Sequence, residues 1–151
     1  MRLTDRTDYA LRVLMVLAAS GRRHTVPALA GAFGVSANHL TKVVQSLQSL
    51  GWVATTAGRG GGVELAVAPS GITVGGVVRA MEPDLHLVEC LREESSCPLE
   101  GACLLVDALR DARGAFFGVL DAVTIADLVA GREARLLRTV PATLRIIGGV
   151  G

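Results

Sequence analysis

Residues 25–67 of this 151-residue chain read TVPALAGAFGVSANHLTKVVQSLQSLGWVATTAGRGGGVELAV. The first part predicts a short helix over 26–33, and Ser36 is a strong N-cap for a second helix that runs to Leu50. Gly34 lies between them, where a glycine allows the sharp change of direction that a helix-turn-helix requires. Two ordinary packed helices would give a similar pattern, so the residues that follow are needed to separate the two interpretations.

A β-hairpin is predicted directly after these helices. Residues 52–56 and 63–67 have the pattern of short strands, and the GRGGG segment at 58–62 predicts a tight loop between them. A hairpin in this position is the wing of a winged helix. The loop carries Arg59 among four glycines, which let the backbone approach a ligand closely, and an arginine suits a narrow minor groove or a phosphate. The combination favours DNA binding.

The second helix of the motif is expected to enter the major groove with its N-terminal end against the base edges. An asparagine there pairs bidentately with adenine, and a lysine contacts guanine or a phosphate. The predicted DNA-contacting residues are Ser36, Asn38, His39 and Lys42 on the helix, with Arg59 and Gly60 in the wing.

Further helices are predicted on both sides of this motif. One covers 4–20, with Thr4 as its cap and with Leu11, Leu14, Met15 and Ala18 as its buried stripe. Others cover 73–81, 104–120 and 125–130. The helix over 104–120 is about 25 Å long. A small domain has few places to bury such a helix, so we interpret it as a dimerisation helix, although a plain core helix has the same pattern.

The expected fold class is therefore mainly α with a small β-hairpin wing. A winged helix-turn-helix domain over 1–82 precedes a cysteine-containing loop over 83–103. The dimerisation helix and a short following helix occupy 104–131, and residues 132–151 form a C-terminal tail.

The composition suits one globular domain, because half of the residues are hydrophobic and 19% are charged. The formal net charge is only +1, but it is unevenly divided. Residues 1–67 carry seven Arg or Lys against three acids, or +4, and residues 68–151 carry eight Arg against eleven acids, or −3. The basic half predicts an anion-binding face.

Other classes of protein are not expected from this sequence. No apolar run has the length of a membrane span and no signal peptide is evident, so we expect a cytoplasmic protein without membrane contact. No Ser/His/Asp pattern or phosphate-binding loop is present, so we do not expect an enzyme.

The three cysteines, Cys90, Cys97 and Cys103, lie close together in the chain. Their C-x6-C-x5-C spacing fits neither paired zinc-binding CxxC elements nor a thioredoxin motif, and their odd number argues against a disulfide framework. Three interpretations compete. Three free thiols in a loop are the least attractive, because exposed cysteines would oxidise readily. The others are a redox switch made of a disulfide and a spare thiol, and a three-thiolate metal site for zinc or an iron–sulfur cluster. His86 is the nearest histidine, although a lone loop histidine is usually only solvated.

Several motifs taken together resemble the dimeric winged-helix iron–sulfur repressors that include NsrR and IscR. The resemblance extends to about residue 130. It rests on Leu3-Thr4 with the TDYALR segment at 7–12, on GRGGG at 58–62, on CPLEGAC at 97–103, and on Leu120-Asp121 followed by TIADL at 124–128.

The resemblance is to the NsrR-like branch of this family. IscR-like members have a histidine ligand three residues after the last cysteine, where this chain has Val106. The resemblance implies a 4Fe–4S cluster held by Cys90, Cys97 and Cys103 in the loop over 83–103. It also implies an oxygen ligand from the partner subunit's first helix, carried onto Asp8. For Asp8 alone, a first-turn acid that complements the helix dipole is the simpler interpretation.

The function that the resemblance implies is a dimeric transcriptional repressor that senses nitric oxide. Nitrosylation or loss of the cluster would release the protein from a palindromic operator in double-stranded DNA. The alternatives are a redox or iron–sulfur status sensor with a 2Fe–2S cluster or a thiol switch, and a zinc-stabilised interaction module without a DNA role. A preparation without a cluster is also compatible with the sequence.

Overall fold

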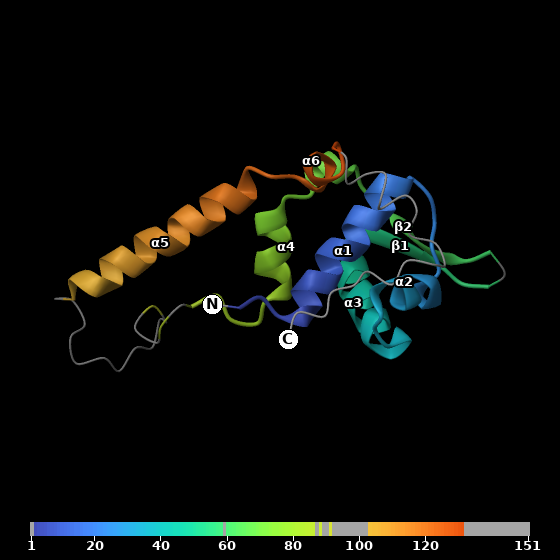
Figure 1. Cartoon of the computed structure of the whole chain (residues 1–151), viewed down its shortest axis with the longest axis horizontal. Helices are drawn as coiled ribbons and strands as arrows, with labels where there is room; N and C mark the ends of the chain where they lie inside the picture. The colour runs from blue at the N-terminus through green and yellow to red at the C-terminus, as the bar shows by residue number, and fades with distance from the viewer. Residues whose placement is uncertain (1, 59, 87, 89–90, 92–102, 132–151) are drawn as a thin grey trace.

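The structure, a computed structural model, describes residues 2–58, 60–86, 88, 91 and 103–131. The central helix α1 has α2, α3 and the β-hairpin on one side and α4 and α6 on the other, while α5 projects away from this body (Figure 1). The fold class predicted from the sequence is confirmed. The elements are α1 (Asp5–Ser20), α2 (Val26–Phe33), α3 (Ala37–Ser49), β1 (Val53–Thr56), β2 (Gly62–Leu65), the 3-10 turn η1 (Pro69–Gly71), α4 (Val74–Met81), α5 (Leu104–Asp121) and α6 (Ile125–Leu128).

Five of these helices begin at a residue whose hydroxyl accepts a hydrogen bond from a backbone N–H in the first turn. Such a bond satisfies one of the amide groups that the helix start leaves without a partner. The caps are Thr4, Thr25, Ser36, Thr73 and Thr124, and among them the predicted caps Thr4 and Ser36 are confirmed.

The core lies around α1, which contacts α3, α4, α6 and β2. The predicted stripe of α1 is partly wrong, because Leu11, Met15 and Ala18 are only half-buried. The fully buried positions are instead Ala10, Val13, Leu14, Val16 and Leu17. A helix that is packed from several sides buries a wider face than a surface helix, so a single stripe could not describe it.

The wing is a two-stranded antiparallel hairpin in which Val53 pairs with Leu65 and Thr56 pairs with Gly62. The second strand ends earlier than predicted, and Val67 is 43% exposed. The segment before α2 adds a short third pairing, in which His24 and Val63 exchange backbone hydrogen bonds of 3.0 and 2.8 Å. The wing is therefore attached to the chain that enters the helix-turn-helix.

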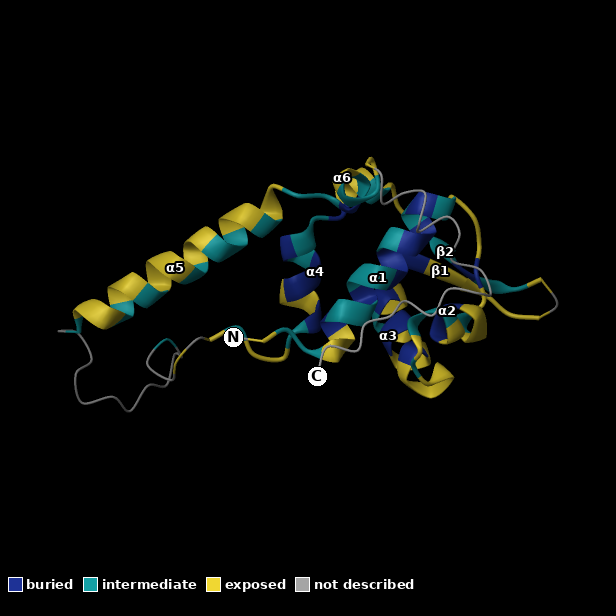
Figure 2. Ribbon diagram, viewed as in Figure 1, coloured by how far each residue is buried: buried dark blue, intermediate teal, exposed yellow. Residues whose placement is uncertain are grey.

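Helix α5 has no buried residue in the described chain, whereas α6 returns to the body (Figure 2). Ile125 of α6 is fully buried, and its amide donates to the Ile72 carbonyl at 2.9 Å. The helix predicted to run to Leu50 ends one residue earlier, and Leu50 is its exposed C-cap. No helix in the described part of the chain has the length and apolar character needed to cross a membrane.

The base of α5 is fixed on α4 by a close contact. Arg79 donates two hydrogen bonds of 2.6 and 2.5 Å to the Asp121 carboxylate, and its guanidinium lies 4.3 Å from the centre of the Phe117 ring. The Arg79 guanidinium holds the pKa of Asp121 below its ordinary value, chiefly through these hydrogen bonds. A Cβ on Gly75 would lie 2.1 Å from Asp121 Oδ1, so only glycine allows this approach.

Candidate nucleic-acid interface and metal ligands

Helix α3 has one buried face and one polar exposed face, as an amphipathic surface helix should. Its buried residues are Leu40, Val43, Val44 and Leu47. Its N-terminal end is exposed, and the turn before it is closed by Gly34 in the left-handed conformation. The helix is thus held by its apolar face while the opposite face is open to a ligand.

The four predicted contact residues on α3 are all exposed, but their environments differ. Ser36 Oγ accepts from the His39 amide at 3.1 Å, so this hydroxyl is already engaged as the helix cap. The His39 ring stands edge-on to Tyr9 of α1, with 5.4 Å between ring centres. Within the described residues, Asn38 and Lys42 make no side-chain hydrogen bond or ion pair, so both are free to bind a ligand.

The wing places Gly60 at an exposed turn with φ of 80°, whereas Arg59 lies outside the described residues. Gly62 has φ of 153°, and a Cβ there would lie 2.5 Å from the His24 carbonyl oxygen. This glycine therefore lets the hairpin pack against the segment before α2. An ion pair of 2.5 Å between Arg23 and Glu64 joins the same two segments.

The base of the wing contains a buried histidine that the sequence did not indicate as special. His24 is 8% exposed, and its Nε2 lies 2.8 Å from Ser20 Oγ. Burial lowers the pKa of His24 below its ordinary value, and the nearby positive charge of Arg22 lowers it further. The neutral imidazole is therefore the form that the folded chain favours.

A polar groove between α1 and α3 is a second feature that sequence reasoning missed. Its volume is about 400 Å³, and Arg6 of α1 faces it. The Arg6 guanidinium donates to Ser46 Oγ at 2.7 Å. No local motif connects two residues that are 40 positions apart, so only the fold reveals this contact. The groove is lined by Arg6, His39, Lys42, Val43, Gln45, Ser46 and Ser49.

The four predicted metal ligands are not brought together in the described part of one chain. Cys90 and Cys97 lie outside it. Cys103 is a free, half-buried cysteine at the N-terminal end of α5, the end that lies away from α1 (Figure 1). Asp8 lies on α1 with its side chain 47% exposed. The described residues contain no group of three His, Cys, Asp or Glu that could hold a metal ion.

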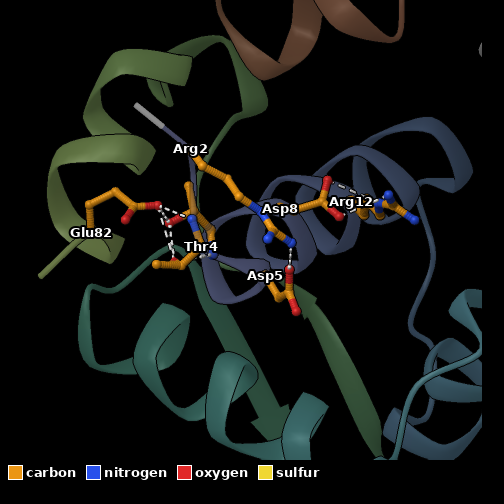
Figure 3. Close-up of polar contacts among 7 residues, drawn as sticks. Arg2, Thr4, Asp5, Asp8, Arg12 and Glu82 are labelled. Carbon is orange, nitrogen blue, oxygen red and sulfur yellow. Dashed lines mark hydrogen bonds and ion pairs between the residues drawn. The ribbon is translucent and has the colours of Figure 1, made fainter. Parts of the chain in front are cut away.

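Asp8 is paired with a cation on its own helix (Figure 3). Arg12 Nη2 lies 2.8 Å from Asp8 Oδ2, and Arg12 Nε donates to Asp8 Oδ1 at 3.1 Å. The Arg12 guanidinium also lies 5.9 Å from the centre of the Tyr9 ring. A series of contacts therefore connects Asp8 through Arg12 and Tyr9 to His39 on α3.

The first turn of α1 is also tied to the start of the cysteine-containing segment (Figure 3). Glu82 Oε1 accepts hydrogen bonds from the Thr4 amide at 2.8 Å, from the Thr4 hydroxyl at 3.1 Å and from the Thr7 hydroxyl. Thr7 is fully buried. Segment 83–103 thus begins beside the helix turn that precedes Asp8.

Comparison with known proteins gives consistent matches over most of the chain. A family model described as Rrf2, iron-dependent transcriptional regulator, matches residues 3–131. The HTH-type transcriptional regulator NsrR of Geobacillus kaustophilus is 44% identical over 137 residues, covering 89% of this chain and 93% of that protein. The HTH-type transcriptional repressor NsrR of Streptomyces coelicolor is 43% identical over 140 residues, covering 91% and 94%.

Solved structures match as well. The structure of CymR, the global cysteine regulator of B. subtilis, has a TM-score of 0.68 and 26% identity, and the match covers 86% of this chain and 97% of that one.

Proposed function

Because the chain belongs to the Rrf2 family of iron-dependent transcriptional regulators, we propose that it is a homodimeric, nitric oxide-sensing repressor that binds a palindromic operator. Membership in this family confirms two predictions from the sequence. The protein is a DNA-binding transcriptional regulator, and it is not an enzyme.

The proposed DNA contacts follow from the exposed face of α3 and from the wing. The side chains of Asn38 and Lys42 are exposed at the end of α3 that meets base edges in helix-turn-helix proteins. Gly60 and Arg59 would contact the minor groove or a phosphate, with Ser36 and His39 supporting the end of α3. A two-fold dimer places two such helices on the DNA, so the operator is expected to be palindromic.

The proposed dimer interface is the projecting helix α5. Leu104, Leu105 and Val119 are 84%, 62% and 66% exposed in the single chain. Large apolar side chains gathered on one helix are characteristic of a surface that a partner covers. A second copy of α5 supplies a matching apolar surface, because a two-fold interface uses the same patch on both subunits.

The donor set fits an iron–sulfur cluster, because thiolates are the ligands that iron–sulfur clusters use. Cys90, Cys97 and Cys103 would hold a 4Fe–4S cluster, and the partner subunit's Asp8 would complete it. Two observations support a ligand from the partner. Cys103 lies at the end of α5 away from its own α1, and the Asp8 carboxylate is half-exposed. When bound, such a cluster supplies iron with which nitric oxide reacts.

The observation that carries the proposal is the series of contacts from Asp8 to His39. In the described chain, Asp8 is bound by Arg12, Arg12 lies over Tyr9, and the edge of Tyr9 meets His39. A change in what Asp8 binds alters the position of Arg12, and the ring contacts pass this change to the end of α3. Ligand exchange at Asp8 and DNA binding by α3 are thereby coupled.

The test begins with protein purified without oxygen, for which iron and sulfide are counted and a visible absorption spectrum is recorded. The Asp8→Ala variant is expected to lose iron, whereas the matched Asp5→Ala variant, which removes an exposed acid of the same turn, keeps it. The wild-type protein should retard a palindromic duplex selected from a random pool, and nitric oxide should abolish the retardation.

Three outcomes would contradict the proposal. If cluster-free, nitrosylated and intact protein bind the duplex with equal affinity, the cluster does not control DNA binding and the protein is not a nitric oxide sensor of the proposed kind. Zinc in place of iron, with no binding to any duplex, would indicate a zinc-stabilised module. Two iron and two sulfide per chain, in place of four of each, would indicate a 2Fe–2S cluster and contradict the proposed cluster type.

A further inference from the structure

The groove between α1 and α3 has the character of an anion site. Arg6 and Lys42 bring positive charge to it, and no acidic residue is among its lining residues. Within the described chain, neither cation forms an ion pair, although most other described arginines of the basic half do. The positive charge of the groove is therefore available to a ligand.

Arg6 is held in place for such a ligand. Its guanidinium donates one hydrogen bond to Ser46 Oγ, and this hydroxyl in turn donates to the Lys42 carbonyl at 2.9 Å. A guanidinium has five donor hydrogens in a planar arrangement, so the remaining donors can bind a phosphate in the bidentate manner that arginine favours. Ser46 thus fixes the position of the Arg6 guanidinium and leaves its other donor hydrogens available to a ligand.

Arg6 of α1 contacts α3 at Ser46. The distance along α3 from Asn38 to Ser46 is similar to the width of a DNA groove. Ser46 follows Asn38 by eight residues, which is about 12 Å along a helix axis. The major groove of B-DNA is also about 12 Å wide. If Asn38 meets the base edges inside the groove, Arg6 and Ser46 lie beside its wall, where the phosphates are.

Arg6 and Asp8 point to different sides of α1. Two residues apart on a helix are separated by about 200° around its axis. Arg6 therefore faces α3 and the groove, while Asp8 faces away with Arg12. The same helix turn can then serve both DNA and the partner subunit without competition.

We propose that Arg6, positioned by Ser46 and assisted by Lys42, binds a phosphate of the DNA backbone at the edge of the major groove. This inference rests on the proposed DNA-binding function and adds a site on α1 to it. A phosphate contact orients the protein on the duplex but carries no base information. Loss of the phosphate contact made by Arg6 must therefore weaken binding to all DNA sequences alike.

The experiment compares wild-type protein with Arg6→Gln, using fluorescence anisotropy at a series of salt concentrations. The probes are a duplex selected from a random pool by the wild-type protein and an unselected duplex of the same length. Arg6→Gln is expected to weaken binding to both duplexes about tenfold. It should also reduce the slope of log affinity against log salt by about 2, because each of two subunits loses one phosphate contact worth about 0.9.

Three further variants define the effect. Arg110→Gln removes an arginine on α5 that is paired with Asp107, and it should leave the affinity and the slope unchanged. Arg6→Lys keeps the charge and should restore most of the slope. Ser46→Ala should weaken binding less than Arg6→Gln with nearly the wild-type slope, and thermal unfolding checks that each variant is folded.

The outcomes separate this inference from the function on which it rests. If the wild-type protein binds neither duplex, the proposed function fails. If the wild-type protein binds and Arg6→Gln has the same affinity and slope, the phosphate site on α1 is wrong. A loss confined to the selected duplex, with the wild-type slope, would also overturn it, because it would assign Arg6 to base recognition.

Discussion

The carboxylate of Glu82 accepts a hydrogen bond of 2.8 Å from the backbone amide of Thr4, although 78 residues separate them. Through this contact, the residue that ends α4 also binds the cap of α1. Both ends of the cysteine-containing segment are thus connected to helices of the body, one through Glu82 and the other through α5, whose base Arg79 fixes on α4.

Replacement of Glu82 should destabilise the fold. Glu82→Ala leaves the Thr4 amide and the buried Thr7 hydroxyl without their acceptor, and a hydrogen bond to a charged group contributes about 2 kcal/mol. We expect the free energy of unfolding in urea to fall by about that amount. The matched variant Glu64→Ala removes an exposed ion pair with Arg23 and should cost about 0.5 kcal/mol. Equal effects of the two variants would show that Glu82 acts only as a surface charge.

Substitution of Gly75 provides a test of the junction between α4 and α5. Alanine normally stabilises a helix relative to glycine by roughly 0.5–1 kcal/mol. At Gly75 the sign should be reversed, because the new Cβ would lie 2.1 Å from Asp121 Oδ1. We expect Gly75→Ala to lose roughly 1–3 kcal/mol in thermal unfolding. Gly31→Ala, which meets nothing within 4 Å, should gain stability in the same assay.

Local signals in the sequence predicted most of the fold. A cap such as Ser36 acts on the amide three residues later, and the glycines of the wing act on their own backbone, so both leave a readable pattern. The sequence was a poorer guide to which residues of α1 are buried, because their burial depends on the elements that surround the helix.

The candidate site was predictable only in part. The exposed polar residues Asn38 and Lys42 follow from the helical period of α3. The contacts of Arg6 with Ser46 and of Glu82 with Thr4 join residues that are 40 and 78 positions apart. Neither pair belongs to a local motif, so tertiary structure alone brings them together.

Disruption of the apolar face of α5 should separate the proposed dimer. Leu105→Asp places a charge at a position that is 62% exposed in the single chain and that a partner would bury. Burial of an unpaired charge is strongly unfavourable, so we expect sedimentation velocity to detect monomers. Asp111→Lys changes a charge on the polar side of the same helix and should leave the dimer intact. Monomers in the wild-type sample would contradict the dimer itself.

The stability of the fold should fall as the pH decreases below the ordinary histidine pKa of 6.5, and His24 is the expected cause. Burial lowers the pKa of His24 in the folded chain, and the charge of Arg22 adds to this effect. Above 6.5 the imidazole is neutral in both the folded and the unfolded chain, so it causes no pH dependence there. Below 6.5 the unfolded chain binds the proton first, and the equilibrium shifts towards unfolding until the folded chain is protonated as well.

His24→Gln removes this titration and retains a side chain that can hydrogen-bond Ser20, whose hydroxyl lies 2.8 Å from the imidazole. Urea unfolding of both proteins at about pH 7.5 and about pH 5.5, on either side of the ordinary histidine range, measures the difference. The wild-type midpoint should decrease more than the variant midpoint between these conditions. Since β2 pairs with the backbone of His24, the loss should begin at the wing. The protection factor of the Val63 amide, which corrects the exchange rate for its intrinsic dependence on pH, should decrease in acid in the wild-type protein only. Parallel pH profiles for the two proteins would instead assign the acid sensitivity to other groups.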